Sequence, residues 1–331
     1  MADLAVAEGR ILDEILTETH KIWSEGLLPK RYEQWYTAQL GTAFGRQHLR
    51  RIALVDGADV LASAKEYTFR AILDGRSVRI VGLGAVFTQP AQRGKGAAPE
   101  LIERMLAAAT ADGADLALLF SEIGPDYYAR LGFETIQLLD RTLRVTESTR
   151  YGAPATLVRA AEDRDLADIV AMGEVRANGY RFHLVRDRDT LYYAIAKKRL
   201  LAGLGPVGAR EVQFFIAEEG ASAVAYVLIT VKRNDANGRP AMAWTIEECG
   251  DRDPSGARVG AILQALIARD PAELRPTITA WLPGGFCPPQ VTIVNERPST
   301  DVMMVRALSD RARAALPIAA SDVLYWRSDA F

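Results

Sequence analysis

The sequence predicts the same order of strands and helices twice along the chain. In the first half, a helical pattern at 11–23 precedes extended segments at 51–55, 60–69 and 77–88, a helix at 98–111 and an apolar run at 116–120. In the second half, a helix at 163–172 precedes segments at 212–217, 223–231 and 242–248, a helix at 257–268 and an apolar run at 277–281. The two series are offset by about 160 residues, and such self-similarity indicates an internal duplication.

The order of strands and helices in each copy predicts a fold of the α/β (α+β) class. The turns at 56–59 and 74–75 connect strands that are expected to be antiparallel. The apolar run at 116–120 follows a helix instead, as a buried parallel strand would. The turn-rich segment Tyr151-Gly152-Ala153-Pro154 predicts a linker. We therefore expect a first domain at 1–150 and a second at 151–331, each a mixed, mostly antiparallel sheet with flanking helices.

The composition excludes several classes of protein. With 40 Lys and Arg against 42 Asp and Glu, the net charge is −2, so a general nucleic-acid binder is not expected. The apolar stretches are far shorter than the roughly 20 residues of a membrane helix, and the acidic N-terminal segment does not fit a secretory signal. Cys249 and Cys287 are too few for a disulfide scaffold and are expected to be buried, inert thiols. The composition predicts a cytoplasmic protein without membrane or nucleic-acid partners.

The segment from Val86 to Ala98 is the one most suggestive of chemistry. It leaves a strand, turns through small residues and opens a helix. Small residues let backbone N–H groups approach a ligand closely, and a helix N-terminus favours anions. Arg93 and Lys95 add positive charge, so the segment is a candidate cradle for a pyrophosphate. The alternative is that its glycines serve only a tight turn between strand and helix.

Two motifs in this part of the chain resemble those of a known superfamily. Arg93-x-x-Gly96-x-Ala98 matches the Arg/Gln-x-x-Gly-x-Gly/Ala signature of the GNAT acyl-CoA-dependent N-acyltransferases. About 30 residues later, the run 128–133 resembles their Tyr-x-x-x-Gly-Phe segment. The resemblance extends over residues 10–145, and over the second half by element order alone. It implies two tandem GNAT-like domains, in each of which the parallel fourth and fifth strands splay apart.

The resemblance also implies a co-substrate, acetyl-CoA, and its position. The acyl-pantetheine would lie between the strands at 77–88 and 116–120. Within the first of these strands, Gly82 and Gly84 are typical of a place where another backbone or a ligand approaches closely. The implied CoA-binding residues are Val86, Phe87, Thr88, Arg93, Gly94, Lys95, Gly96, Ala97, Ala98 and Ser121.

For the chemistry, the resemblance implies Tyr128 as the general acid that protonates the leaving thiolate. The alternative is that Tyr128 is a packed aromatic residue. The base is open, since the strand at 77–88 contains no carboxylate; Glu66, Glu122 and Asp126 are candidates. The chain is also similar to the Eis-type aminoglycoside acetyltransferases, which use their C-terminal carboxylate in the active site. That similarity adds Phe331, the last residue, to the catalytic candidates.

The expected reaction is acetyl transfer to a primary amine of a small molecule or an amino acid. The segment Thr88-x-Pro90-x-x-Arg93-Gly94-Lys95-Gly96 resembles fungal lysine N-acetyltransferases, which supports such an acceptor. The aromatic stretch at 23–44 is either an acceptor wall, where cation–π attraction holds an amine, or helix core. Two rival functions stay open: a protein lysine or N-terminal acetyltransferase, and a non-catalytic acyl-CoA sensor.

The second copy is not expected to bind CoA. Its loop at 248–260 lacks the signature spacing, and Asp251 and Asp253 would repel a pyrophosphate. The run Lys197-Lys198-Arg199 is most simply a solvated helix face. The three histidines show no spacing typical of metal ligands, so no metal is expected, and the oligomeric state stays open.

Overall fold

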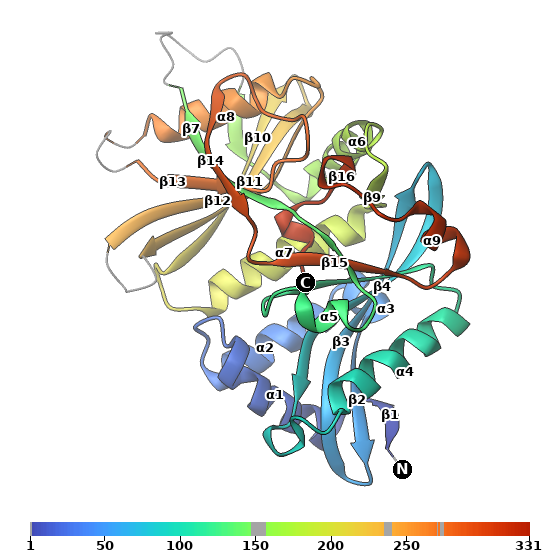
Figure 1. The fold of residues 1–331 in the computed structure, drawn as a ribbon. Helices are drawn as coiled ribbons and strands as arrows, with labels where there is room; N and C mark the ends of the chain where they lie inside the picture. The colour runs from blue at the N-terminus through green and yellow to red at the C-terminus, as the bar shows by residue number, and fades with distance from the viewer. Residues whose placement is uncertain (1, 147–156, 235–239, 270, 272–274) are drawn as a thin grey trace.

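The structure, a computed structural model, describes residues 2–146, 157–234, 240–269, 271 and 275–331. Within them the strands form a sheet of nine strands and a sheet of seven (Figure 1). The first sheet contains β1 (Asp3–Val6), β2 (Leu49–Asp56), β3 (Asp59–Leu73), β4 (Arg76–Thr88), β5 (Leu116–Ser121), β6 (Glu134–Ile136), β9 (Phe182–Leu184), β15 (Val302–Ala307) and β16 (Val323–Leu324). The second contains β7 (Leu139–Val145), β8 (Leu157–Ala160), β10 (Arg210–Glu219), β11 (Ser222–Asn234), β12 (Pro240–Asp251), β13 (Thr277–Ala280) and β14 (Val291–Pro298).

The helices flank these sheets, and each sheet has one long helix against its core. They are α1 (Gly9–Trp23), α2 (Pro29–Leu40), α3 (Ala43–His48), α4 (Ala97–Ala111), α5 (Asp126–Ala129), α6 (Leu166–Ala177), α7 (Arg188–Leu204), α8 (Ala257–Ile267) and α9 (Asp310–Ala315). On the first sheet α4 buries Leu101, Ile102 and Met105, and on the second α8 buries Val259 and Ile262. Apolar residues at helical spacing therefore place the two helices equivalently.

The expected fold class is confirmed in both sheets. Each is mixed and mostly antiparallel, with one parallel pair that follows the pattern of a strand, a helix and a buried strand. In the first sheet Ile80–Leu83 of β4 pairs with Leu116–Leu119 of β5. In the second, Ala243–Ile246 of β12 pairs with Thr277–Ala280 of β13. The duplication that the sequence predicts is therefore present as two equivalent sheets.

The two halves of the chain exchange strands, which the sequence does not predict. The strand β7, which precedes residue 147, lies between β13 and β14 of the second sheet. The strand β15, near the C-terminus, lies between β5 and β6 of the first sheet. The predicted boundary at 150 and the linker at 151–154 fall within 147–156, outside the described residues, so the domain division stays a prediction.

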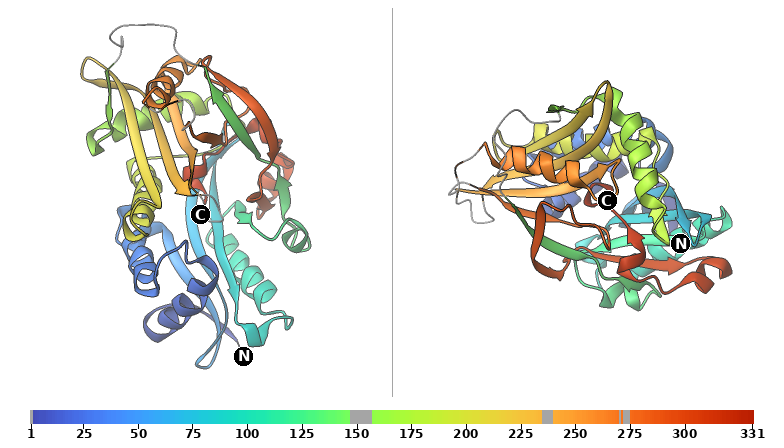
Figure 2. Two further views of the ribbon diagram at one scale, coloured as in Figure 1. Left: turned by 90° about the vertical axis from the view of Figure 1, so that its left-hand side faces the viewer. Right: turned by 90° about the horizontal axis from the view of Figure 1, so that it is seen from above.

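The C-terminal tail runs between the two sheets, and Figures 1 and 2 show its end near the centre of the molecule. It begins with β16, which pairs with β9 at the edge of β3. A short 3-10 turn, Arg327–Asp329, then packs against β12 of the second sheet. The last residue, Phe331, lies against β4 of the first sheet. The tail therefore contacts both sheets over fewer than ten residues.

Two expectations about surface and core are wrong. The run at 197–199 is only partly solvated, because α7 packs against α2, α6 and β10. Arg199 is exposed, but Lys197 is buried and Lys198 is paired with Glu247. Cys249 is buried as expected, but Cys287 is exposed, in the loop between β13 and β14. The aromatic stretch at 23–44 is mainly core, since Tyr32, Tyr36 and Phe44 are buried.

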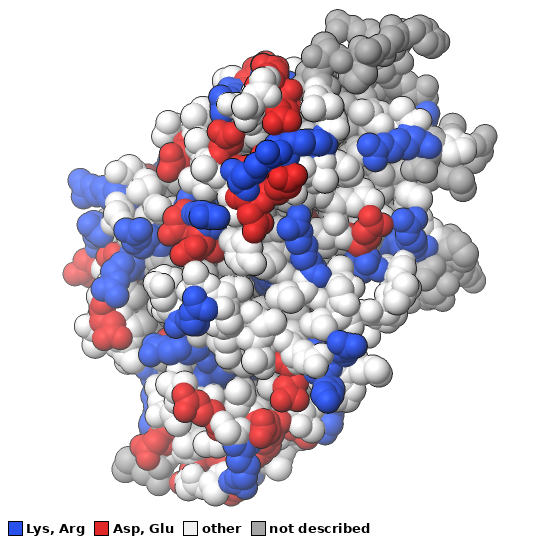
Figure 3. All heavy atoms as spheres, turned by 180° about the vertical axis from the view of Figure 1, so that it is seen from behind, with Lys and Arg blue, Asp and Glu red and all other residues white. Residues whose placement is uncertain are grey.

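Charges of both signs are mixed on one face of the molecule. On the face shown in Figure 3, Lys and Arg side chains are interspersed with Asp and Glu side chains, in keeping with the near-zero net charge. Among the described residues, no helix is long and apolar enough to cross a membrane.

Candidate active site

The parallel strands β4 and β5 separate halfway along β4. Their pairing ends at Leu83, and there the register between β3 and β4 shifts so that β4 has one extra residue between Gly84 and Phe87. Ala85, inside this bulge, has a φ of +47°, a strained value for a residue with a side chain. Beyond Leu83 no described strand pairs with the side of β4 that faces β5. Backbone groups of the predicted CoA-binding segment 86–88 are therefore available to a ligand.

The predicted phosphate loop follows β4 and opens α4. Gly94 and Gly96 have φ values of +77° and +86°, which only glycine adopts without strain. Gly96 is the residue before the first turn of α4, whose leading N–H groups have no partner within the helix. Arg93 and Lys95 are exposed and form no ion pair with any described residue. The structure thus brings 93–98 together at a helix N-terminus that is open to an anion.

In the second sheet the equivalent position is filled by a side chain. The buried carboxylate of Asp251 accepts the backbone N–H of Arg258, in the first turn of α8, at 2.8 Å. It also accepts the N–H of Asp253 at 2.8 Å. A carboxylate of the protein therefore occupies the place that a phosphate takes at such a helix. This arrangement gives a physical reason for the expectation that the second copy does not bind CoA, which stays a prediction.

The close approach expected at Gly82 and Gly84 is made by the C-terminus of the chain. A Cβ atom on Gly82 would lie 2.6 Å from Cζ of Phe331, and one on Gly84 would lie 3.3 Å from its Cδ2. The ring of Phe331 also packs on Tyr67 and Phe120, with centroid distances of 4.5 and 5.7 Å. Its main-chain carboxyl carbon is 3.5 Å from the Cβ position of Gly84. The C-terminal carboxylate therefore lies where β4 and β5 begin to separate.

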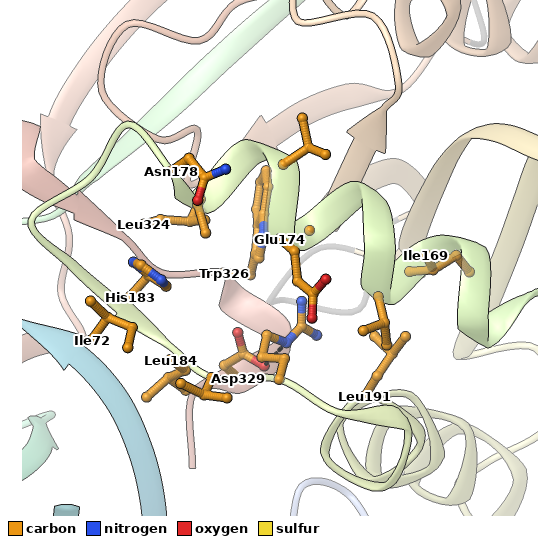
Figure 4. Close-up of a pocket in the computed structure, with 16 residues that line it drawn as sticks. Ile72, Ile169, Glu174, Asn178, His183, Leu184, Leu191, Leu324, Trp326 and Asp329 are labelled. Carbon is orange, nitrogen blue, oxygen red and sulfur yellow. Dashed lines mark ion pairs between the residues drawn. The ribbon is translucent and has the colours of Figure 1, made fainter. Parts of the chain in front are cut away.

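A buried ion network holds the tail in this place. Arg186 donates two hydrogen bonds to Glu248, at 2.6 and 2.7 Å, and its Nε lies 3.2 Å from Asp329. Ser328 donates to the same Glu248 at 2.9 Å. Burial and the neighbouring Glu248 raise the pKa of Asp329 to about 6, although Arg186 opposes the shift. The tail also lines a cavity of about 490 Å³, where Figure 4 shows Trp326 and Asp329 facing α6 and β9.

A second cavity, of about 300 Å³, adjoins Phe331 and is bounded by α2, β3, α7 and β10–β12. Its wall contains Lys65 and Lys197, each only 8% exposed. Burial lowers the pKa of Lys65 to about 7, helped by the charge of Arg51, and lowers that of Lys197 to about 7, helped by Lys198. Sequence reasoning missed both lysines. For Lys65 the sequence held a signal: this charged residue directly follows the small residues Ala62-Ser63-Ala64 within a predicted strand.

Two further predicted residues are Ser121, the last residue of β5, and Tyr128, on α5. Tyr128 is buried on α5 with its ring edge-on to Tyr127 and Phe133. Burial raises the pKa of Tyr128 to about 12, so its hydroxyl keeps its proton at neutral pH. The Ser121 hydroxyl donates to the Gly124 carbonyl at 2.6 Å and stabilises the turn after β5.

The side-chain carboxylates proposed as bases already have partners or lie at the surface. Glu66 accepts a hydrogen bond from Arg50 at 3.0 Å, and Glu122 accepts one from the Trp23 indole at 3.1 Å. Asp126 is exposed at the start of α5. The carboxylates of Glu66 and Glu122 thus each have a hydrogen-bond partner.

We predict that Arg186→Met destabilises the protein by about 3–5 kcal/mol, because it leaves Glu248 and Asp329 buried without their cation. Chemical denaturation measures this difference. Arg181→Met is the control, since Arg181 pairs with Asp74 and Asp322 at the surface, and we expect a loss of about 1 kcal/mol or less. Equal effects of the two substitutions would contradict the account of the buried network.

We also predict that stability rises with pH between about 7 and 10. The lysine pKa is about 7 in the folded protein at Lys65 but about 10.4 in the unfolded chain, so the unfolded state binds the extra proton in this window. The free energy of unfolding should rise by up to about 1.4 kcal/mol per pH unit for each such lysine. Lys65→Met should reduce the slope of stability against pH relative to wild type; an unchanged slope would mean that Lys65 is solvated.

Comparisons with known proteins agree with the geometry. Residues 13–136 match the family model of the acetyltransferase (GNAT) domain. A search of curated protein sequences found no match. Among solved structures, a GCN5-related N-acetyltransferase from Anabaena variabilis superposes with a TM-score of 0.68 at 12% identity, over 93% of this chain and 73% of that one. One from Kribbella flavida has a TM-score of 0.63 at 19% identity, with coverage of 94% and 72%.

Eis1 from Mycobacterium abscessus is also similar, with a TM-score of 0.59 at 16% identity, over 95% of this chain and 76% of that one. At these identities the structures show a shared fold. They show that the whole chain has the fold of GNAT N-acetyltransferases, and residues 13–136 match the model of the GNAT domain.

Proposed function

We propose that the protein transfers an acetyl group from acetyl-CoA to a primary amine of a small molecule or an amino acid. The observation that carries this proposal is the position of the C-terminal carboxylate. Phe331 seats it beside Gly84, where β4 and β5 separate. In the GNAT fold, this opening is where a thioester would lie. A carboxylate at that point is suited to take a proton from an amine that approaches it.

The co-substrate would lie along β4 and at the start of α4. The pantetheine would hydrogen-bond to the backbone of 86–88, which has no paired strand on that side. The pyrophosphate would accept hydrogen bonds from the backbone of 94–98, and Arg93 and Lys95 would contribute charge. No metal is required by this scheme, because the leaving thiolate needs only a proton.

The reaction then has a role for each end of the site. An alkylammonium has a pKa of about 10.4, so the amine must lose a proton before it attacks. The Phe331 carboxylate accepts that proton. The amine nitrogen forms a bond to the thioester carbonyl carbon, the carbon–sulfur bond breaks, and the Tyr128 hydroxyl protonates the departing thiolate. The nitrogen, which carries a positive charge after its attack, gives its second proton to solvent. The products are the N-acetyl amine and CoA, and the two residues return to their starting states by exchange with solvent.

A small acceptor is favoured by the cavity that adjoins Phe331. It has a volume of about 300 Å³, which suits a small molecule, and its lining comes from both sheets. The aromatic wall that the sequence suggested is reduced to Trp35, whose ring faces Lys65. The acceptor amine therefore meets the carboxylate of Phe331 rather than an aromatic cage.

The first test is whether acetyl-CoA binds at the loop. At 100 times its Kd it should stabilise the wild type by about 2.7 kcal/mol, which is a rise of several degrees in Tm. Gly96→Glu should abolish the rise, because it places a strained acidic residue at the pyrophosphate position. Gly220→Glu, at a similar positive φ in the turn between β10 and β11, should retain it. Calorimetry should give one site per chain, and two sites would overturn the argument from Asp251.

The second test concerns the chemistry. Ending the chain at Asp329 should lower turnover by about 10²-fold or more, since general base catalysis contributes 10²–10⁴. The acetyl-CoA shift in Tm should remain. Phe331→Leu keeps the terminal carboxylate and should retain most of the activity, while Tyr128→Phe should lose it. Full turnover by the shortened chain would remove the C-terminus from the mechanism, and no turnover with any amine would leave an acyl-CoA sensor.

A further inference from the structure

The cavity beside Phe331 has more positive than negative charge around it. Six cationic side chains line it, from five different elements: Lys65, Lys197, Lys198, Arg210, Lys232 and Arg327. The carboxylates that line it are Glu25, Glu247 and the C-terminus of Phe331. A cavity built only to hold a cationic amine would be expected to have the opposite balance.

Some of these cations are neutralised by the protein. Lys198 pairs with Glu247 at 2.9 Å, and Arg210 pairs with Glu25 at 3.0 Å. Arg327 pairs with two aspartates outside the cavity, Asp140 and Asp301. The pairs of Lys198 and Arg210 account for both side-chain carboxylates of the lining.

Lys65 and Lys197 have no such partner. Among the described residues no carboxylate lies within 4.0 Å of either ammonium group. Lys65 Nζ faces the rings of Trp35 and Tyr36 at 5.2 and 5.6 Å from their centroids. Lys197 donates a hydrogen bond to the main-chain carbonyl of Ala330. Both are more than nine-tenths buried, and a buried ammonium without an anion is costly for the folded state.

A third buried cation, Arg51, lies next to Lys65 and adds to the cost of burying its charge. Arg51 on β2 lies opposite Lys65 on β3 in the strand register and is 1% exposed. Its one hydrogen bond goes to the Ser63 hydroxyl at 3.1 Å, and its Nε and Nη1 have no partner among the described residues. Two buried cations are thus adjacent, with no anion between them. An anion from outside the chain would relieve that cost.

We propose that this cavity binds the carboxylate of the acceptor, with Lys65 and Lys197 as the residues that hold it. The inference rests on the proposed function and narrows it: the substrate is a small primary amine that also bears a carboxylate, such as a free amino acid. Lys197 lies against Ala330, and Phe331 lines the same cavity, so a carboxylate held there places the other end of a short molecule near the terminal carboxylate. The lysines set specificity, while Phe331 and Tyr128 act on the reacting atoms.

Charge-assisted hydrogen bonds from two buried ammonium groups are strong and directional. A bound carboxylate would also favour the charged form of both lysines, whose pKa values burial lowers to about 7 in the empty cavity. Binding of such a substrate is therefore coupled to proton uptake near neutral pH.

The experiment compares amines that differ only in the carboxylate: lysine with cadaverine, ornithine with putrescine, and phenylalanine with 2-phenylethylamine. With saturating acetyl-CoA, kcat/KM should be at least tenfold higher for the amino acid in at least one pair. Equal or better use of the decarboxylated amine in every pair that reacts would overturn the inference and leave the proposed function standing. If nothing reacts, calorimetry of the same pairs with the protein–CoA complex decides, since binding needs no turnover. Failure of all three amino acids to bind at millimolar concentration would then overturn the inference.

A variant series locates the contact. Lys65→Met should raise KM for the preferred amino acid at least tenfold and change KM for its decarboxylated partner and for acetyl-CoA less than threefold. It removes an unpaired buried charge, so it should fold, and a melting curve verifies this. Lys30→Met, on the exposed start of α2, should change none of these values. An equal loss for both members of the pair would show that Lys65 has only a structural role.

Discussion

The geometry of the site depends on the buried guanidinium of Arg186, which joins the C-terminal tail to β12 of the second sheet. It binds Glu248 of β12 with two hydrogen bonds and lies 3.2 Å from Asp329, two residues from the end of the chain. A free chain end ordinarily frays, because few contacts repay the entropy of ordering it. Here an ion network inside the protein fixes Asp329, so Phe331 has only two peptide bonds of freedom between that anchor and its place on Gly82 and Gly84.

The two copies have taken different roles through small changes at equivalent places. In the first sheet, the helix after the parallel strand begins at Gly96 with unoccupied N–H groups and two basic residues nearby. In the second, Asp251 fills that position, and Glu248 of the same strand binds Arg186 and the Ser328 hydroxyl of the tail. One sheet therefore presents an open helix N-terminus, whereas the other binds the C-terminal tail. The exchange of β7 and β15 makes this division stable, because each sheet needs a strand from the other half of the chain.

Much of the fold could be predicted from the sequence, and the reasons why the rest could not are physical. The periodicity of Leu101, Ile102 and Met105 and the small residues of 93–98 are local signals, and local signals specify helices, strands and tight turns. The partner of a strand is not local: the residues of β7 and β15 do not identify the sheet that each strand joins. The same limit applies to Phe331. Gly82 and Gly84 predict that some group approaches β4 closely, but they do not show that this group is Phe331. Charge was misjudged at Lys197 because a run of basic residues usually lies in solvent, and only the packing of α7 shows otherwise.

The unpaired cations Lys65 and Arg51 are best understood as a balance between stability and binding. At these buried positions, apolar residues of similar volume would leave the free energy of unfolding unchanged or raise it. Stability alone would therefore favour apolar or aromatic residues there, such as Tyr67 and Phe331 in the same lining. A site that must bind an anion has the opposite requirement, since preorganised buried donors have no solvent to displace when the ligand arrives. The seated tail connects the positions of Lys197 and Phe331: Lys197 donates to the Ala330 carbonyl, and the next residue, Phe331, lies against Gly82 and Gly84. In the proposed reaction, recognition of the acceptor and placement of the base therefore depend on the same packing of the tail.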